Sequence, residues 1–316
     1  MATYTAHSAI GQREDLTDVI YDISPTETPF MSSIGKTKAT AVYHEWQTDT
    51  LAAATTNNAA VEGADASDAT LSPTTRLGNY TQILQKTIKV SGTLDAVNKA
   101  GRKSEKAYQL AKASQELKRD LETILLSNQG RSAGSSNSTA RKMGSLLSWI
   151  KTNSSVQTNG GDPTTIGVST RTDGNTRTFT ETLLKGVVAE VFTSGGSPKV
   201  LMVGAAGKQK VSSFTGISAY RYNVNGSAAP AAIVGAADIY VSDFGNMSVV
   251  PNRFMRTRDA LILDPEYAAL AYLRPFQTIE LAKAGDADKT QVLVEVTLEV
   301  KNEAAHGIVA DLDMSL

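Results

Sequence analysis

One segment with almost no large apolar side chains constrains this chain most. From Leu51 to Asn79 the larger apolar residues are only Leu51, Val61, Leu71 and Leu77, and the rest is mostly Ala, Thr, Asn and Asp. Such a segment buries too little apolar surface to offset the entropy lost when it is ordered. Because strand-like sequence bounds it on both sides, the pattern predicts a long extended excursion that finds its partner on another chain.

The flanking strands predict a two-stranded hairpin. Thr40–Thr50 is strand-like, and in Tyr80–Thr93 the residues Leu84, Ile88 and Val90 lie on one face, with polar residues between them. An isolated hairpin is only marginally stable in water, so we expect this one to lean on another surface.

The residues before the hairpin predict an arm. Leu16, Val19 and Ile20 allow one or two amphipathic helical turns. Pro25 and Pro29 should end any helix there and hold the chain extended. Three large apolar residues follow as an anchor against some surface: Phe30, Met31 and Ile34.

A long helix and a long strand predict the body. Lys103–Asn128 predicts a helix that would span roughly 39 Å, with four apolar residues on one face: Leu110, Leu117, Leu121 and Ile124. The alternation from Val292 to Val300 predicts an antiparallel strand with one face on a core. Leu270–Phe276 and Thr278–Ala282 are expected near it.

Alternating helices and short strands predict a compact α/β subdomain over Phe179–Asp264. Its first helix, Thr180–Phe192, is capped by Thr180, and Lys199–Val203 is a buried strand. Between the two regions, Ser127–Thr180 is rich in Ser, Thr, Gly and Asn, and predicts loops around one apolar island at Leu146–Ile150.

No motif predicts a catalytic, cofactor or metal site. The chain has no cysteine, its three histidines are far apart, and no G-x-S-x-G is present. Gly204–Lys208 is too short for a phosphate loop, and Asp264 with Glu266 fits a capped turn better than an acid/base pair. Asp286 and Asp288 lack the other ligands of a calcium loop.

Charge and hydropathy argue against two further classes of protein, although a local basic face is compatible with the net charge. The chain has 31 Lys+Arg against 32 Asp+Glu, a net charge of -1, without the basic excess of a protein that grips nucleic acid. No apolar run approaches the ~20 residues of a membrane helix, and Met1–Ile10 lacks the pattern of a signal peptide. We therefore expect synthesis in a cytoplasm and no contact with a membrane.

The order of arm, long hairpin, strut helix, compact insert and terminal sheet resembles the major capsid protein of tailed phages, which has the Hong Kong 97-type fold. Local phrases carry the same resemblance: Arg13–Tyr21, Ser24–Phe30, Trp46–Asp49, Asn79–Ile83, Val294–Asn302 and Ala305–Gly307. The resemblance implies an α+β fold in four parts. Residues 1–38 would form an N-terminal arm and 39–91 an extended loop. Residues 92–178 and 265–316 would form a peripheral domain with spine helix 103–128, and 179–264 an axial domain near five-fold and six-fold axes.

The same resemblance implies a structural protein that assembles into an icosahedral shell around phage DNA in the virion, after synthesis in the bacterial host cytoplasm. Its main partner would be itself, in pentamers and hexamers, with portal, scaffolding or cement proteins as candidates and double-stranded DNA touched only weakly. No lysine occurs from Leu51 to Asn79, so we expect a non-covalent grip. No long charged helical leader precedes the arm, so a fused scaffolding segment is not expected. The candidate inter-subunit contacts are Arg13, Leu16, Pro25, Pro29, Phe30, Trp46, Leu51, Leu71 and Tyr80.

Two other classes compete with this interpretation. Another assembly subunit, from a tail tube or a surface layer, would typically be all-β, and the helix at Lys103–Asn128 argues against it. An enzyme with Leu51–Asn79 as a flexible lid would need a pocket of titratable residues, which the sequence does not supply.

Overall fold

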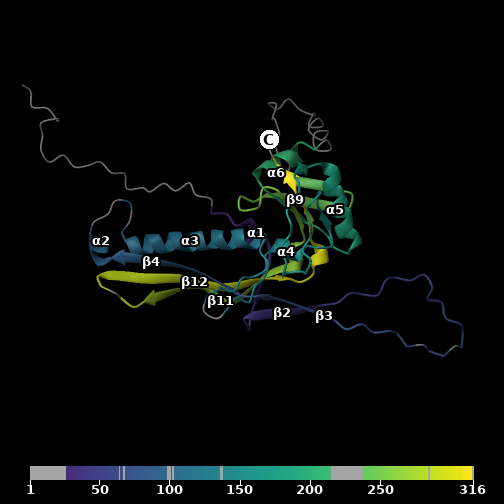
Figure 1. Ribbon diagram of the computed structural model, residues 1–316, viewed down its shortest axis with the longest axis horizontal. Helices are drawn as coiled ribbons and strands as arrows, with labels where there is room; N and C mark the ends of the chain where they lie inside the picture. Colours follow the sequence, from purple (N-terminus) through teal and green to yellow (C-terminus); the bar gives the residue numbers. More distant parts are fainter. Residues whose placement is uncertain are drawn as a thin grey trace, which may run out of the picture.

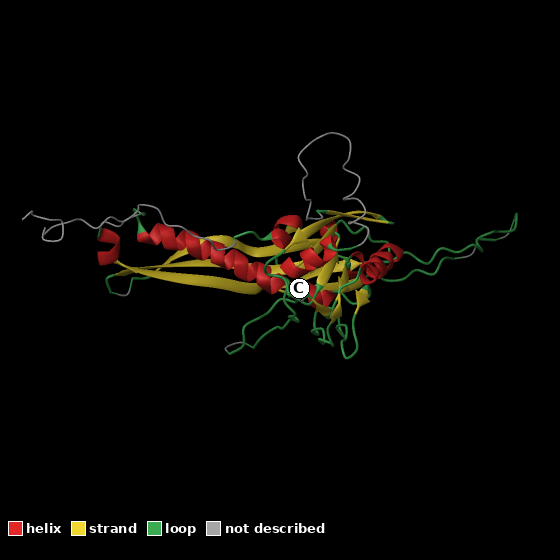
Figure 2. Ribbon diagram, turned by 90° about the horizontal axis from the view of Figure 1, so that it is seen from above, coloured by secondary structure: helices red, strands yellow, loops and turns green. Residues whose placement is uncertain are grey.

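The computed structural model describes residues 26–63, 65–66, 68–97, 101, 103–135, 138–214, 238–283 and 285–314. The molecule is elongated (Figure 1). A long helix lies along a long sheet, a compact α/β region sits at one end, and a hairpin loop projects beyond that end. Figure 2 shows the same order from above, with the loop pointing away from the far end of the helix.

The strut helix is α3, Glu105–Leu125. Ser104 caps it by accepting a hydrogen bond from the Ala107 N–H. The helix is shorter than the predicted 103–128 at both ends. Leu117 and Leu121 are buried as expected, whereas Leu110 and Ile124 pack only at the border of the core. The helix therefore buries a narrow stripe against the sheet beneath it.

The sheet under α3 has four strands in the order β1 (Gly35–Lys38), β11 (Ala268–Leu281), β12 (Ala287–Val300) and β4 (Gln82–Ser91). β12 is antiparallel to both neighbours, as predicted, while β1 runs parallel to β11. The two predicted segments around residue 277 are one continuous strand, β11. Its register with β12 shifts between Tyr272 and Gln277.

The predicted return strand of the hairpin was wrong. β2 (Tyr43–Thr48) pairs with β3 (Thr75–Tyr80), and β4 pairs with β12 instead. The alternating apolar residues of β4 explain this, because Leu84 and Val90 are buried on the face that α3 covers. The extended loop therefore ends near Tyr80, and β4 belongs to the long sheet rather than to the loop.

The compact region is built on a second sheet of six strands. Its order is β5 (Ser154–Ser155), β13 (Gly307–Val309), β10 (Ala260–Leu263), β7 (Val200–Val203), β9 (Gly245–Pro251) and β8 (Ile239–Ser242). Helices α5 (Glu181–Thr193) and α6 (Ala205–Ser212) pack on one face, and the other face continues into the core under α3. Thr180 caps α5 as predicted.

The segment after β12 differs from expectation, since its strands do not complete the long sheet. β13 lies between β10 and β5 in the second sheet, and β14 (Leu312–Asp313) pairs with β6 (Arg177–Thr178). A 3-10 turn at Glu303–Ala305 separates β13 from β12. The fully buried Ile308 and Val309 face opposite sides of the second sheet, which holds this segment in the compact region.

Short helices connect these parts. They are α1 (Pro29–Ser33), α2 (Gly92–Ala96), α4 (Leu146–Trp149) and the 3-10 turn Pro265–Tyr267, which Asp264 caps as predicted. Pro29 begins a helix instead of holding the chain extended, because the fixed φ of proline suits the first helical position. The predicted apolar island at Leu146–Ile150 is confirmed as a fully buried turn of the core.

Candidate assembly surfaces

The tip of the extended loop is the most exposed apolar segment among the described residues. Leu51, Val61 and Leu71 are 98%, 79% and 88% exposed. The described residues from Asp49 to Thr74 form no strand or helix, and the two arms of the loop run side by side away from the body (Figure 1). Two of the predicted contact residues, Leu51 and Leu71, therefore lie free on this subunit.

The base of the loop, in contrast, is fixed to the body by Asn79. This residue is fully buried. Its Nδ2 donates to the carbonyl oxygens of Gly144 at 3.1 Å and Leu298 at 2.8 Å, and its Oδ1 accepts from the Gly144 N–H at 2.8 Å. These bonds join the end of β3 to β12 and to the loop before α4, so a rotation of the loop at this point would leave several buried polar groups without partners.

A buried carboxylate fixes the next turn of chain. Thr81, which separates β3 from β4, donates its hydroxyl to Glu295 at 2.9 Å. The same carboxylate accepts from Arg141 at 2.7 Å and from Arg274 at 2.7 Å. The register shift in β11 places Arg274 directly opposite Glu295. Two guanidinium groups thus balance the one buried charge, as burial of a carboxylate requires.

Aromatic rings complete the base. Trp46 packs on Trp149 with ring centroids 5.2 Å apart, and Tyr43 packs on Tyr80 at 4.6 Å. The Arg131 guanidinium lies over both Tyr43 and Trp149, and it donates to the carbonyl of Gly78. Trp46 and Tyr80, predicted as contacts with a neighbour, are therefore half-buried against their own subunit.

The root of the arm is also an internal contact. Phe30 is 1% exposed and belongs to the core under α3, together with Met31 and Ile34, while Pro29 is half-buried. These three residues therefore pack against the core of their own subunit, and Phe30 is not exposed for contact with a neighbour. Arg13, Leu16 and Pro25 lie outside the described residues.

The compact region exposes apolar side chains that the sequence pattern did not predict. Phe192 at the end of α5 stacks on Phe244 in the turn after β8, with centroids 4.6 Å apart, and both side chains remain about half exposed. On the edge strand β8, Ile239 and Val241 are 61% and 72% exposed. The sequence signal was available, because Phe192 falls outside the inward stripe of α5. Ile239 and Val241 flank the buried Tyr240, which packs toward α5, so they lie on the opposite face of β8. We call the stacked rings of Phe192 and Phe244 the edge patch.

The comparisons with known proteins agree with this architecture. A model of the SU10 major capsid protein family matches residues 2–313, nearly the whole chain. The chain belongs to the SU10 major capsid protein family. A major capsid protein of Escherichia phage Phieco32 is 27% identical to it, and the alignment covers 96% of each chain. The protein is therefore a structural subunit of a phage capsid, an icosahedral shell, and not an enzyme.

Solved capsids share the fold of this SU10-family subunit. The capsid of cyanophage A-1(L) superposes with a TM-score of 0.67 at 12% identity, covering 98% of each chain. The capsid of a native GTA particle gives 0.63 at 11%, again over 98% of each chain. An encapsulin of Synechococcus elongatus gives 0.58 at 11%, over 100% of this chain and 98% of the other. The predicted Hong Kong 97-type α+β fold is confirmed.

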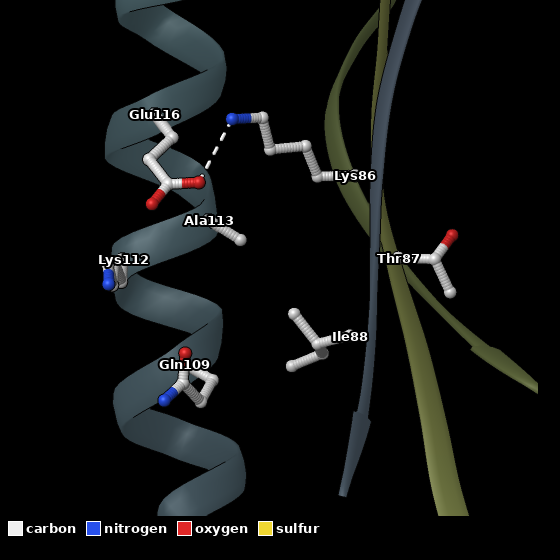
Figure 3. Close-up of a pocket in the computed structure, with 7 residues that line it drawn as sticks. All are labelled: Lys86, Thr87, Ile88, Gln109, Lys112, Ala113 and Glu116. Atoms are coloured by element: carbon white, nitrogen blue, oxygen red, sulfur yellow. Dashed lines mark hydrogen bonds and ion pairs between the residues drawn. The ribbon is translucent and has the colours of Figure 1, made fainter.

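A hollow along the spine of this capsid subunit carries ion pairs rather than catalytic groups. It lies between α3 and β4 (Figure 3), where the Lys86 ammonium is 2.9 Å from Glu116 and 3.2 Å from Asp120. Burial works to lower the pKa of Lys86, but the two carboxylates outweigh it and raise the pKa. Lys86 therefore stays protonated at neutral pH and cannot serve as a base.

The described part of this capsid subunit offers neither a metal site nor a membrane-spanning helix. It contains no cluster of three or more His, Asp or Glu side chains that could hold a metal ion. None of its helices is both long and apolar enough to cross a membrane. His44 is half-buried beside Glu299 at 3.1 Å, as a strand residue rather than a ligand.

Proposed function

We propose that subunits of this capsid protein hold one another through non-covalent contacts of the N-terminal arm and the extended loop, and gather in pentamers and hexamers through the compact α/β region. One observation carries the proposal: a long loop with exposed Leu51, Val61 and Leu71 stands on a base that buried polar groups lock in place. A segment of this kind gains its order only from a neighbour.

The locked base gives the loop a mechanical role. Asn79 and the Glu295 cluster fix the direction in which the base of the loop leaves the body, and the tip becomes ordered when it meets a neighbour. Interfaces of obligate assemblies typically bury about 2,000–5,000 Å². A long loop and an arm supply such an area without enlarging the compact body.

The parts of the chain divide this work. In our proposal residues 1–28 act as the arm, residues 40–80 act as the extended loop, α3 with the four-stranded sheet forms the peripheral domain, and the six-stranded sheet with α5 and α6 forms the axial domain. The edge patch then lies where axial domains meet. The loop carries no lysine from Leu51 to Asn79, which favours packing over a covalent cross-link.

Further partners follow from the chemistry of the subunit. A net charge of -1 suits copies that sit side by side, and favours only weak contact with packaged DNA. Synthesis in the cytoplasm of a bacterial host and residence in the virion complete the proposal, with portal, scaffolding or cement proteins as candidate further partners.

The test removes the loop tip and keeps its base. Residues 51–73 are replaced by a short Gly-Ser linker, so that β2, β3 and Asn79 stay intact. We expect a folded, soluble subunit that forms no closed shell in electron micrographs. A matched variant with Asn57→Ser, Asn58→Ser and Thr70→Ser, which changes exposed polar residues of the same tip, should form shells normally. Normal closed particles from the linker variant would contradict the proposal.

A further inference from the structure

Glu122 is a buried carboxylate without a cationic partner among its hydrogen bonds. It lies on α3, and its side chain is fully buried. Oε1 accepts from the backbone N–H of Phe30 at 2.7 Å and from Nδ2 of Asn252 at 2.7 Å, and Oε2 accepts from the Met31 N–H at 2.9 Å. Burial raises the pKa of Glu122, and these three hydrogen bonds oppose the rise.

The three partners are all donors, which fixes what the side chain must be. A carboxylate offers acceptors on both oxygens, so it satisfies all three. An amide would turn its NH₂ group toward at least one of them and leave that buried N–H without an acceptor. The position therefore discriminates between Glu and Gln, although their shapes are nearly the same.

The bonds to Phe30 and Met31 replace a local helix cap. Thr28 is the N-cap residue of α1, yet its side chain makes no capping bond. The N–H groups of the first helical turn need acceptors, and a side chain 92 residues away from Phe30 supplies them. The turn that ends the arm is thus completed only when it docks on α3.

The third bond brings in the compact region. Asn252 follows directly after β9, and its backbone N–H donates to the carbonyl of Val203 at the end of β7. The carboxylate of Glu122 consequently joins the arm root, the spine helix and the six-stranded sheet at one point.

We propose that Glu122 is the positioning residue of the N-terminal arm: it docks α1 on the spine helix and so fixes the point from which residues 1–28 reach toward a neighbouring subunit. The inference rests on the assembly role proposed above for the arm. Twenty-eight residues span at most about 100 Å when fully extended, so a fixed root decides which neighbours the arm can reach.

Hydrogen exchange of the unassembled, full-length subunit tests the docking directly. In Glu122→Gln we expect the protection of residues 29–34 to fall at least about tenfold, because a buried N–H loses a charged acceptor. The protection of β7, residues 200–203, should change less than about threefold. The control is Glu116→Gln, which neutralises a half-buried carboxylate on the same helix and should leave both segments unchanged.

Two results would overturn the inference. One is native protection of residues 29–34 in Glu122→Gln. The other is an equal loss of protection in residues 29–34 and in β7, which would mean that Glu122 only stabilises the fold.

A second variant separates this inference from the role of the arm. If a subunit lacking residues 2–25 closes normal shells, the arm has no part in assembly. The proposed assembly role of the arm would then be wrong, and so would the claim that Glu122 positions the arm for a neighbouring subunit. The exchange result with Glu122→Gln would still decide whether the carboxylate docks α1.

Discussion

The imidazole of His306 lies inside the subunit, 1% exposed, just before β13. Burial lowers the pKa of His306 to about 4, and the backbone of Tyr267 opposes this shift. Above pH 6.5 the ring is neutral in both the folded and the unfolded chain. Below that value the unfolded chain takes up a proton first, so the stability contributed by this residue is lost as the pH falls from about 6.5 to about 4.

We expect His306 to cost the unassembled subunit about 2–3 kcal/mol of unfolding free energy between pH 7 and pH 4.5. Asp259 works in the opposite direction, because burial raises its pKa to about 6 and the folded state then gains from protonation. The loss of unfolding free energy between the two pH values must therefore be compared between the native protein and a variant without the imidazole. Urea unfolding at both pH values should show a smaller acid loss in His306→Gln than in the native protein. Equal losses would mean that the ring is not protected from protonation.

Single residues also show where sequence reasoning stops. Phe30 and Trp46 were predicted as contacts with a neighbour because they are large apolar residues in segments with few others. That pattern correctly marks them as anchors. It does not say on which chain the anchor lies, and the structure places both against their own core. The sequence did not identify three buried polar residues, Asn79, Glu122 and Glu295, because it does not show that their hydrogen-bond partners lie on distant elements.

At the scale of elements, the long helix is the most dependable prediction. Leu117 is 1% exposed at the centre of the α3 stripe. Leu117→Asp would bury an unpaired charge, and the cost exceeds several kcal/mol, comparable with the whole stability of a typical domain. We expect this variant to be unfolded at 25 °C by circular dichroism. Gln115→Asp, on the exposed side of the same helix, should melt within a few degrees of the native protein.

The hairpin shows why strands were easier to predict from the sequence than the strands with which they pair. The alternation in β4 correctly predicted a strand with one buried face, but the sequence order suggested β2 as its partner. Pairing is decided by burial. β4 gains a core by joining β12 under α3, whereas the short strand β3, with the buried Gly78 and Asn79, fits tightly beside β2. Gly78 leaves no room for a side chain, because a Cβ there would lie 2.8 Å from the Tyr43 ring.

At the scale of the molecule, the order of arm, loop, spine and compact insert was predictable because each part has its own composition and periodicity. The contribution of the last strands to the compact region was not, since β13 and β14 are too short to show a period. The edge patch was missed for a related reason. An exposed apolar side chain can be recognised only when the buried ones around it are known.

The edge patch supports the last prediction. Phe192 and Phe244 present stacked, half-exposed rings on the compact region, near β8, which is the outermost strand of the six-stranded sheet among the described residues. Apolar surface of this kind marks a contact between proteins. Because we place the compact region at the centre of pentamers and hexamers, the double variant Phe192→Glu and Phe244→Glu should fold normally but sediment as a monomer.

The matched control is Val168→Glu, since Val168 is 43% exposed on a different surface loop. It introduces one glutamate of the same kind, against two in the double variant, and should leave the sedimentation of the native protein unchanged. Pentamers or hexamers formed by the double variant would show that the edge patch lies outside the contact. If the edge patch did lie in the contact, the introduced glutamates of neighbouring subunits would face one another around the symmetry axis and their repulsion would prevent assembly.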